Sequence, residues 1–385
     1  MAKNFKVTII ASGLTLSNGG PSKTISFFKN ALAAKVFALT DKKKYELEGS
    51  AIQGAIHLIN SESFIGKYFS FSKISKDVEA SIAESDILSC HIFWRYNVVL
   101  TYYLSKKYKI PYIFVPHGSI DPYVLKRNSF VKKIFLYLIG KRFLRDASRI
   151  ICASETEKEN FLKVFNSEDI SVINWPVEVN PDYSSIDKNQ VYKKYNLSKY
   201  KKKLLFLGRL HPVKRPIELI RCFAKSHHQN AQLIIVGPFE SYSKDQINKI
   251  IESEGLDQDD VRVLGPLYHK EKEEVLYVSD AIVSISEREN FGHVLVEALA
   301  HEKPIIVSKG CYIYKELQLA SCGIFVKSNE DIDIIKALDD FITMSNQAHK
   351  KMGKNGKSWV SEKLNIETFN SSLKEVIGKI INNNA

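Results

Sequence analysis

The sequence predicts an α/β protein with two Rossmann-like, doubly wound domains in tandem, each built on a parallel sheet. The first observation behind this prediction is length, because 385 residues suffice for two domains of roughly 150 residues each. The second is order, since short β-branched or apolar runs alternate with longer amphipathic stretches, as in sheets with right-handed crossovers. We expect the two domains to face each other across a cleft and to bind a ligand there, at the carboxyl ends of their strands.

Composition excludes several other classes of protein. Apolar residues make up 44% of the chain and charged residues 25%, which is ordinary for a globular protein and unlike a disordered or collagen-like one. The chain has no run of about 18 apolar residues, so we expect no membrane-spanning helix. The five cysteines form no CxxC pair, which favours reduced thiols and a cytoplasmic protein.

The N-terminal domain is predicted to span residues 1–175. A turn at Gly19-Gly20 introduces a helix at Ser22–Ala34, and runs rich in β-branched and aromatic residues predict the strands. These strands are expected at Val7–Ala11, Asp86–Cys90, Tyr112–Val115, Arg149–Ala153 and Ile170–Ile173.

Residues 176–203 are polar and are predicted to form a linker with one short helix at Gln190–Tyr195. A second α/β series follows over residues 204–364, in which several of the expected strands end at a glycine. They are Leu204–Gly208, Gln232–Val236, Val261–Leu264, Ala281–Ser286, Pro304–Val307 and Gly323–Val326. The last segment, about 365–385, is expected to form a helix that packs back on the N-terminal domain.

The positive charge of the chain is concentrated in one segment. The net charge is +12, and Val124–Ile150 holds eight basic side chains and one acidic side chain. Helical spacing gives this segment a basic and an apolar stripe: Lys141, Arg145 and Arg149, and Phe130, Ile134 and Leu138. Two interpretations stay open: a helix that lies on an anionic membrane, where each base contributes about 1 kcal/mol, or a solvated helix with one face on a core. No nucleic-acid partner is expected, because no recognisable binding module is present.

Two motifs could carry chemistry, and each follows a predicted strand and precedes a predicted helix. In the first, Gly208–Arg215, Arg209 and Lys214 would lie at a strand end near a helix N-terminus, where a diphosphate is well held. Solvated loop cations are the alternative interpretation of that motif.

The second motif, Ser286–Glu297, places Glu289 and Glu297 eight residues apart, about two helical turns. A carboxylate within the apolar stretch around Glu297 needs a partner, and sugar hydroxyls would suit it. Gly292 would let the backbone approach a ligand closely.

In this order and spacing, the motifs resemble those of the retaining nucleotide-sugar glycosyltransferases of family 4, which have the GT-B fold. The matching features are the E-x7-E pair Glu289 and Glu297, the G-R-L-x3-K loop from Gly208 to Lys214, and the Gly19-Gly20 loop. The stretch Val115–Pro122 is similar to the PHGxLDP stretch of family members that build surface polysaccharides. The resemblance spans essentially the whole chain.

The resemblance implies roles for the matching positions of the C-terminal domain. Arg209 and Lys214 would hold the donor diphosphate and stabilise the leaving group, and Glu297 would bind the ribose hydroxyls. Glu289 would contact the donor sugar. The backbone amides close to that sugar would come from Asn290, Phe291, Gly292 and His293.

In the N-terminal domain, which the resemblance makes the acceptor-binding one, Gly20 would let its loop approach the phosphates. His117 would face the reacting sugar and join Arg209, Lys214 and Glu289 as the catalytic group. His91, Ser119 and Asp121 are candidates for the acceptor side, although His91 is equally well interpreted as a core or loop histidine.

The resemblance also implies the reaction. A sugar would move from a nucleoside-diphosphate sugar to a hydroxyl of a glycan or lipid-linked glycan, with retention of configuration and without a metal or other cofactor. The setting would be the synthesis of O-antigen, capsule or exopolysaccharide at the inner face of the cell membrane. A nucleotide-sugar epimerase of GT-B architecture and a non-catalytic nucleotide-binding relative remain as alternatives.

The sequence departs from the family pattern at two places. Asn290 stands where the family usually has glycine, which leaves the identity of the donor sugar open. The family also has an acidic residue in a later Gly-rich loop, and Glu316 is the candidate for that position here. Two DxD strings, Asp257–Asp259 and Asp331–Asp333, are interpreted as chance matches to the metal-binding motif of another glycosyltransferase fold, and no metal site is predicted.

Overall fold

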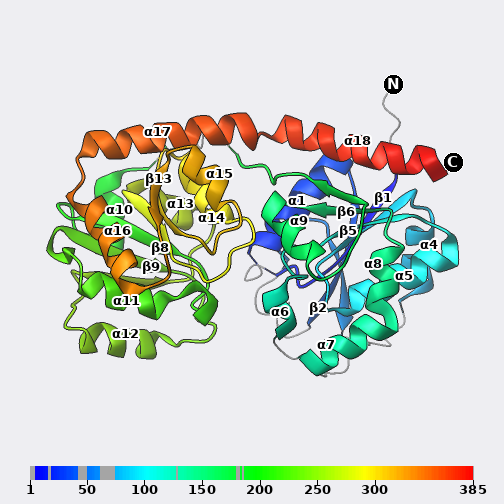
Figure 1. Cartoon of the computed structure of the whole chain (residues 1–385), viewed down its shortest axis with the longest axis horizontal. Coiled ribbons are helices and arrows are strands. Elements are labelled where there is room, and N and C mark those ends of the chain that lie inside the picture. The colour runs from blue at the N-terminus through cyan, green and yellow to red at the C-terminus, as the bar shows by residue number, and fades with distance from the viewer. Residues whose placement is uncertain are drawn as a thin grey trace. The chain divides into compact units, whose positions relative to one another are not determined.

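The computed structural model describes residues 5–15, 19–41, 50–60, 74–126, 129–178, 183 and 186–384. The chain divides into two compact units, the first comprising Met1–Pro176 with Ile366–Ala385 and the second Val177–Asn365. Each unit is a parallel sheet surrounded by helices (Figure 1). The predicted fold class is confirmed for each of the two units.

The first unit contains a seven-stranded sheet in the order β3-β2-β1-β4-β5-β6-β7, with parallel pairing throughout. Its strands are β1 (Val7–Ser12), β2 (Lys35–Asp41), β3 (Ile56–Asn60), β4 (Ile87–His91), β5 (Tyr112–Val115), β6 (Arg149–Cys152) and β7 (Ile170–Val172). The strand order reverses between β1 and β4, which makes the sheet doubly wound. Strands β1, β4 and β5 are buried along their whole length, as expected where helices cover both faces.

The helices of the first unit connect these strands. They are α1 (Gly20–Leu32), α4 (Lys76–Ala83), α5 (Tyr96–Tyr108), α6 (Pro122–Lys126), α7 (Ser129–Phe135), the π-helix η2 (Leu136–Gly140), α8 (Lys141–Arg145), α9 (Glu155–Leu162) and the C-terminal α18 (Ile366–Asn384). Of the seven strands that the structure describes in this sheet, five match strands predicted from the sequence; β2 and β3, at one edge of the sheet, were not predicted.

The second unit contains a six-stranded parallel sheet in the order β10-β9-β8-β11-β12-β13, with its reversal between β8 and β11. Its strands are β8 (Lys202–Leu207), β9 (Ala231–Val236), β10 (Val261–Gly265), β11 (Ala281–Ser284), β12 (Ile305–Ser308) and β13 (Gly323–Val326). Its helices are α10 (Lys188–Tyr195), η3 (Pro212–Lys214), α11 (Pro216–Ala224), η4 (His228–Asn230), α12 (Lys244–Ser253), α13 (His269–Val278), α14 (His293–Ala300), α15 (Tyr314–Leu319), α16 (Asp331–Thr343) and α17 (Asn346–Lys363).

Most of the segment predicted as a linker, residues 176–203, belongs to the second unit instead. Helix α10 packs on α13, where the ammonium of Lys194 lies 2.9 Å from a carboxylate oxygen of Glu274. The hydroxyl of Tyr195 donates a hydrogen bond of 3.1 Å to the same Glu274 carboxylate. The short helix expected at Gln190–Tyr195 is present as α10, and Lys194 and Tyr195 attach it to α13 of the second unit.

Helix α18 packs on α1 of the first unit. The ring of Phe369 lies 5.5 Å from that of Phe28 and 6.4 Å from those of Phe27 and Trp175, in edge-to-face geometry. All four rings are buried. This aromatic cluster ties the last segment of the chain to the first helix.

The basic segment Val124–Ile150 is only partly the amphipathic helix that its spacing suggested, because α7, η2 and α8 follow one another without a break over residues 129–145 and the helix then ends. It comprises α6, α7, η2, α8 and the start of β6, and Arg149 lies in β6, where it pairs with Asp169. The expected apolar stripe faces solvent: Phe130 is 73% exposed, and Ile134 and Leu138 are exposed as well. The core contacts of this region come instead from Phe135, Phe143 and Leu144.

No helix among the described residues combines the length and the apolar character needed to cross a membrane.

Replacing the anchor of α18 should destabilise the first unit. Phe369→Ala removes a buried ring and leaves a cavity, so we expect the free energy of unfolding to fall by about 3–5 kcal/mol in urea denaturation followed by circular dichroism. Glu367→Ala, on the same helix and exposed, should change it by less than about 0.5 kcal/mol. Equal stability of the two variants would contradict the packing of α18 on α1.

Candidate functional site

The loop after β8 carries the first predicted motif, and its path depends on a close backbone contact. Gly237, at the end of β9, has φ 152°, and a Cβ there would collide with the carbonyl oxygen of Gly208. The loop continues into the short helix η3 and then α11, with Arg215 in the left-handed region between them. This path puts Arg209 and Lys214 at the carboxyl edge of the sheet, beside the strand-order reversal.

The two predicted phosphate-binding cations both have carboxylate partners in this structure. Arg209 Nη1 lies 2.6 Å from Glu240 Oε2, and both side chains are nearly half exposed. Lys214 forms an ion pair with Glu289, and here both side chains are largely buried. The structure therefore brings together Lys214 and Glu289 from two separate motifs, and it directs Arg209 to a residue that the sequence analysis did not single out.

The loop after β11 holds Glu289 in place through a neighbouring loop. The Glu289 amide donates to Gly310 O at 2.8 Å, and the Tyr312 amide donates to Glu289 O at 2.9 Å. Gly310 is required for this approach, because a Cβ there would collide with the carbonyl oxygen of Ser286. Gly292, with φ 73°, then begins α14.

The charge state of Glu289 is set by two opposing effects. Burial raises the pKa of this carboxyl, but the neighbouring Lys214 ammonium outweighs burial, and the net pKa lies below its usual value. The carboxylate is therefore ionised at neutral pH and available to accept hydrogen bonds. A small hollow beneath the pair is lined by Lys214, Glu289, Gly292 and the ends of β8 and β11.

Glu297 lies on α14 within the apolar stretch, and its partner is a lysine. Lys272 of α13 places its ammonium 2.9 Å from Glu297 Oε2. Burial lowers the pKa of Lys272, but Glu297 outweighs it and the net pKa is raised. The partner that the sequence required for Glu297 thus comes from the chain itself. Lys272 was missed because it stands in an ordinary run of charged residues.

Two further side chains, Asn290 in the loop after β11 and Glu316 in α15, carry unpaired acceptors in the described part of the chain. Asn290 Oδ1 and Glu316 Oε2 are shielded from solvent and have no hydrogen-bond partner in the described part of the chain. The side chain of Phe291 is buried, so at this position only the backbone amide could contact a donor sugar, as predicted. Buried acceptors without donors are rare in proteins and fit a ligand that presents hydroxyl groups.

In the first unit, His117 and His91 form a hydrogen-bonded pair at the carboxyl edge of the sheet. His117 follows β5 with φ 52°, and its Nε2 lies 2.9 Å from His91 Nδ1. His91 Nε2 lies 2.9 Å from Ser89 Oγ. Burial, with a smaller effect of His117, lowers the pKa of His91 well below its usual value, so His91 is neutral.

The other predicted residues of the first unit have mainly structural contacts. Ser119 Oγ accepts from the Phe93 amide at 2.9 Å, and the buried Asp121 accepts from the Tyr123 amide at 2.7 Å. Gly20 is the first residue of α1, directly after Gly19, which has φ 59°. The interpretation of His91 as a core histidine fits its burial, and the hydrogen bond to His117 gives it a place in the site as well.

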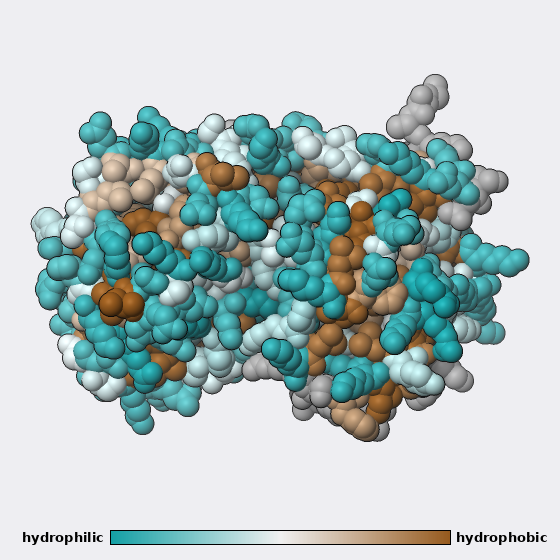
Figure 2. Space-filling model, in the orientation of Figure 1, coloured by the Kyte–Doolittle hydropathy of each residue, from teal (hydrophilic) through white to brown (hydrophobic). Residues whose placement is uncertain are grey.

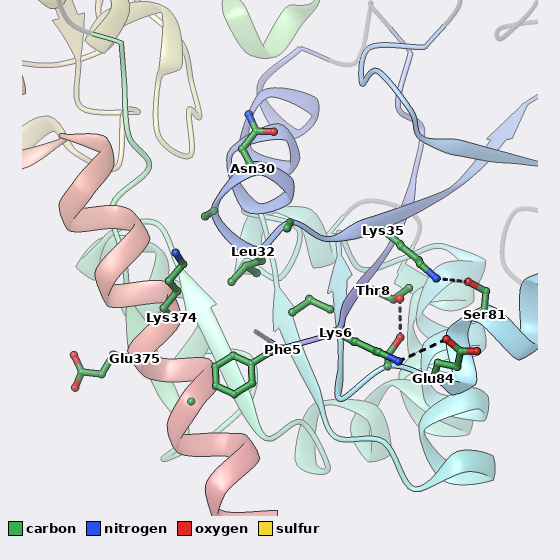
Figure 3. A pocket seen from close by; sticks show the side chains of 15 residues that line it. Phe5, Lys6, Thr8, Asn30, Leu32, Lys35, Ser81, Glu84, Lys374 and Glu375 are labelled. Atoms are coloured by element: carbon green, nitrogen blue, oxygen red, sulfur yellow. Dashed lines mark hydrogen bonds and ion pairs between the residues drawn. The ribbon is translucent and has the colours of Figure 1, made fainter. Parts of the chain in front are cut away.

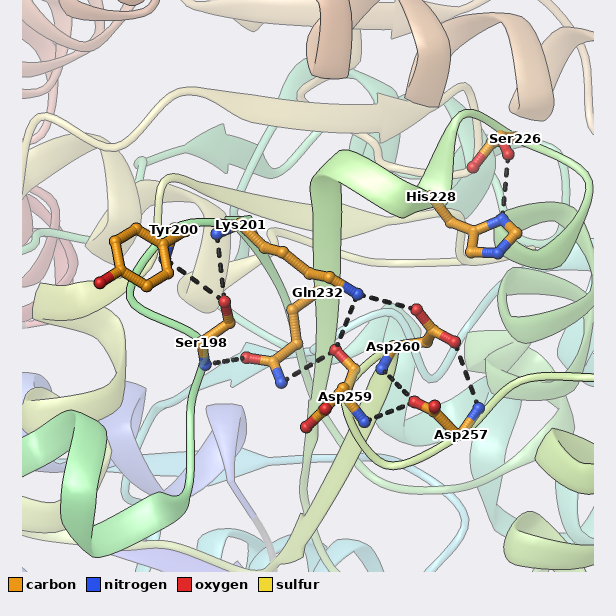
Figure 4. A network of polar contacts seen from close by, with 9 residues as sticks. All are labelled: Ser198, Tyr200, Lys201, Ser226, His228, Gln232, Asp257, Asp259 and Asp260. Atoms are coloured by element: carbon orange, nitrogen blue, oxygen red, sulfur yellow. Dashed lines mark hydrogen bonds and ion pairs between the residues drawn. The ribbon is translucent and has the colours of Figure 1, made fainter.

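The first DxD string forms a hydrogen-bonded turn before β10 (Figure 4). Asp257 Oδ1 accepts from the amides of Asp259 and Asp260 at 2.7 and 3.1 Å, and Asp260 Oδ1 lies 3.0 Å from Lys201 Nζ. The second string opens α16. Within the described ranges, no group of three or more His, Cys, Asp or Glu side chains is arranged to hold a metal ion.

A pocket of about 840 Å³ lies in the first unit at the opposite edge of the sheet, where β1 begins (Figure 3). In the wall of this pocket, Lys6 Nζ lies 3.8 Å from Glu84 Oε2, and Lys35 Nζ donates to Ser81 Oγ at 2.9 Å. Phe5 also lines it. None of the predicted site residues does, because they all follow the carboxyl ends of strands.

Removing one member of the Lys214–Glu289 pair should destabilise the second unit in a pH-dependent way. Lys214→Met leaves a largely buried carboxylate unpaired, which we expect to cost about 1–3 kcal/mol at pH 7 in urea denaturation. In the parent, the pKa of Glu289 is lower in the folded state than in the unfolded state. The ion pair therefore stabilises the fold fully at pH values above the unfolded-state pKa, and this contribution is lost as the pH falls through the folded-state pKa.

The difference between the parent and Lys214→Met should therefore shrink below about pH 4.5. Arg209→Met, whose ion pair is exposed, is the control and should cost less than about 1 kcal/mol at either pH. A Lys214→Met penalty that is absent at pH 7, or unchanged at low pH, would contradict the ion pair.

Two family models match the chain over consecutive ranges. The model described as Glycosyltransferase Family 4 matches residues 19–180, and the one described as Glycosyl transferases group 1 matches residues 187–359. The boundary between the two ranges lies close to the boundary between the two units.

Two curated relatives share about half of their length with the chain. The N-acetyl-alpha-D-glucosaminyl L-malate synthase of Bacillus anthracis is 26% identical over 199 residues, which are 50% of each chain. The phosphatidylinositol N-acetylglucosaminyltransferase GPI3 subunit of Saccharomyces cerevisiae is 30% identical over 211 residues, which are 51% of this chain and 46% of that one. The chain thus spans about half the length of the curated relatives it matches.

Among solved structures, that of HepE from Anabaena in complex with UDP and glucose has a TM-score of 0.77 at 17% identity. The match covers 97% of this chain and 100% of the HepE chain. At this low identity, the likeness shows the fold alone. The likeness to this solved structure shows that the chain has the GT-B fold. Since the two family models together account for most of the sequence, the chain belongs to family 4 of the glycosyltransferases.

Proposed function

We propose that the chain moves a sugar from a nucleoside-diphosphate sugar to a hydroxyl of a glycan or lipid-linked glycan, with retention of configuration. The observation that carries this proposal is the meeting of Lys214 and Glu289 at the carboxyl edge of the second sheet, in a chain of this family. The similarity of Val115–Pro122 to family members that build surface polysaccharides supports an acceptor from O-antigen, capsule or exopolysaccharide synthesis.

In the proposed mechanism, the donor replaces internal ion pairs. The diphosphate takes the place of Glu240 on Arg209 and of Glu289 on Lys214, so both cations stabilise the charge that develops on the leaving group. Glu289 is then released to accept hydrogen bonds from sugar hydroxyls. The bond between the anomeric carbon and the phosphate oxygen breaks on the face where the acceptor oxygen bonds, and the acceptor proton passes to the leaving phosphate.

Glu297 and Lys272 are proposed to hold the ribose. A carboxylate accepts well from two neighbouring hydroxyl groups, and the Lys272 ammonium pairs with Glu297 inside an apolar helix face. We propose that Arg209 and Lys214 supply the positive charge for the leaving diphosphate, with no metal ion or other cofactor. UDP-sugars are the first donors to test, because HepE is described with UDP and glucose and two relatives are named for N-acetylglucosaminyl products.

Donor binding should identify one nucleotide sugar. In a thermal-shift panel of UDP-, GDP- and ADP-sugars, we expect one donor to raise the melting temperature by several degrees and to be hydrolysed slowly in the absence of an acceptor. Arg209→Ala and Glu297→Ala should each abolish both responses, whereas Arg221→Ala, which removes an exposed arginine of α11, should keep them. Parent-like responses of Arg209→Ala and Glu297→Ala would mean that the site is misplaced, and an epimerised sugar formed from donor alone would favour the epimerase.

We further propose that the first unit docks peripherally on anionic membrane at the cytoplasmic face, through α7, η2 and α8. Phe130 and Tyr137 are 73% and 79% exposed, and Ile134 and Leu138 are exposed beside them. The exposed bases of this surface are Lys126, Lys133, Lys141, Arg142 and Arg145. Apolar and basic side chains together on one surface favour the interface of an anionic bilayer, and Figure 2 shows brown and tan side chains on this unit.

Helix α5 extends this surface in a way that the sequence alone did not indicate. Lys106 lies 2.7 Å from Asp146, which directly follows α8, and the neighbouring Tyr103 is 55% exposed. The basic surface therefore includes residues about 40 positions apart in the chain. A lipid-linked acceptor held in the same bilayer would then meet the unit at its surface.

Vesicle co-sedimentation tests this docking. The chain should bind vesicles that contain phosphatidylglycerol and not those of phosphatidylcholine alone, and added salt should weaken binding. The double variant Phe130→Ala/Tyr137→Ala should lower the affinity at least about tenfold, because two exposed rings no longer enter the interface. Tyr200→Ala, which removes a 97% exposed ring from the second unit, is the control and should bind like the parent. Salt-insensitive or absent binding would remove the proposal.

A further inference from the structure

The turn that carries His117 has an unfavourable backbone conformation. His117 and Gly118 have φ values of 52° and 69°, two consecutive residues in the left-handed region. Glycine adopts this conformation readily, whereas the Cβ of histidine makes it costly. Such a residue keeps its conformation only if the surrounding structure holds it there.

A buried carboxylate holds this turn. Glu157 is 1% exposed and comes from the first turn of α9, after the N-cap Ser154. Its Oε1 accepts a hydrogen bond from the Gly118 amide, and its Oε2 accepts one of 2.6 Å from the Ala153 amide. The carboxylate therefore bridges the turn after β5 and the end of β6.

The ring of His117 is held from a second direction. Its Nε2 shares a hydrogen bond with Nδ1 of the fully buried His91, whose other nitrogen is paired with Ser89. The ring of Trp175 lies 5.9 Å away on another side. Backbone and ring thus have separate supports, and both supports are buried in the first unit.

We propose that Glu157 is a positioning residue of the glycosyltransferase reaction. It fixes the backbone of the His117–Gly118 turn, while His91 fixes the imidazole, so that His117 presents one orientation to the reacting sugar. Glu157 does not touch the substrate and acts through His117. This inference rests on the proposed function and on the role facing the reacting sugar that the family resemblance implies for His117. It adds a residue that neither the motifs nor the resemblance singled out.

The test compares Glu157→Gln with Glu159→Gln on the same helix. The glutamine keeps the volume of Glu157, but its amide nitrogen cannot accept from the second backbone N–H. We expect kcat for hydrolysis of the responding nucleotide sugar to fall 10- to 100-fold, with KM changed less than about threefold. Glu159 is exposed, so Glu159→Gln should match the parent. Unchanged kcat in Glu157→Gln would overturn the proposal.

A double-mutant cycle separates positioning from general destabilisation. In a His117→Ala background, Glu157→Gln should cause little further loss of kcat, because its effect passes through the missing imidazole. An equal loss in both backgrounds would show that Glu157 only supports the fold.

Histidine NMR tests the same idea without activity. The imidazole signals of His117, assigned from His117→Ala, should shift or broaden in Glu157→Gln and stay unchanged in Glu159→Gln. If the parent hydrolyses no nucleotide sugar, the proposed function fails, and these signals still decide whether Glu157 positions His117. Parent-like His117 signals in Glu157→Gln would overturn the proposal that Glu157 positions His117.

Discussion

The ion pair between Lys214 and Glu289 is the interaction on which the candidate site depends. It joins the loops after β8 and β11, the two strands between which the order of the second sheet reverses. Because the pair is largely buried, neither loop can move without separating opposite charges in a poorly solvated place. The contacts of Gly237 with Gly208 and of Gly310 with Ser286 serve the same arrangement by letting neighbouring backbones come close enough for the loops to meet.

Sequence reasoning was most successful where chemistry follows a strand. The strands before Arg209 and Glu289 are short apolar runs that end in glycine or polar residues, and this pattern predicted both the strands and the placement of the motifs at one edge of a sheet. It failed where a partner comes from a distant element. Lys272 is a charged residue among charged residues, and Glu157 occupies an ordinary first-turn position of a helix, so only the fold shows what they contact.

The basic segment illustrates a different failure. Its periodicity was real, and α7, η2 and α8 form one continuous helical stretch over residues 129–145, but that stretch ends before Arg149, which lies in β6. Helical spacing assigned Phe130, Ile134 and Leu138 to one face correctly, yet it could not tell that this face is exposed while Phe135 turns inward. Which side of an amphipathic helix meets the core is decided by tertiary packing, and a one-dimensional pattern does not contain that information.

The pairing of Arg209 with Glu240 has a consequence for catalytic turnover. Glu240 is tethered beside the guanidinium, so it competes with any phosphate for Arg209 at a high local concentration. With Arg209 in its proposed role at the donor diphosphate, such an internal competitor would weaken the binding of donor and nucleotide product alike. Once the product begins to leave, Glu240 would pair with the guanidinium again, which would shorten the residence time of the product and keep its release from limiting the catalytic cycle.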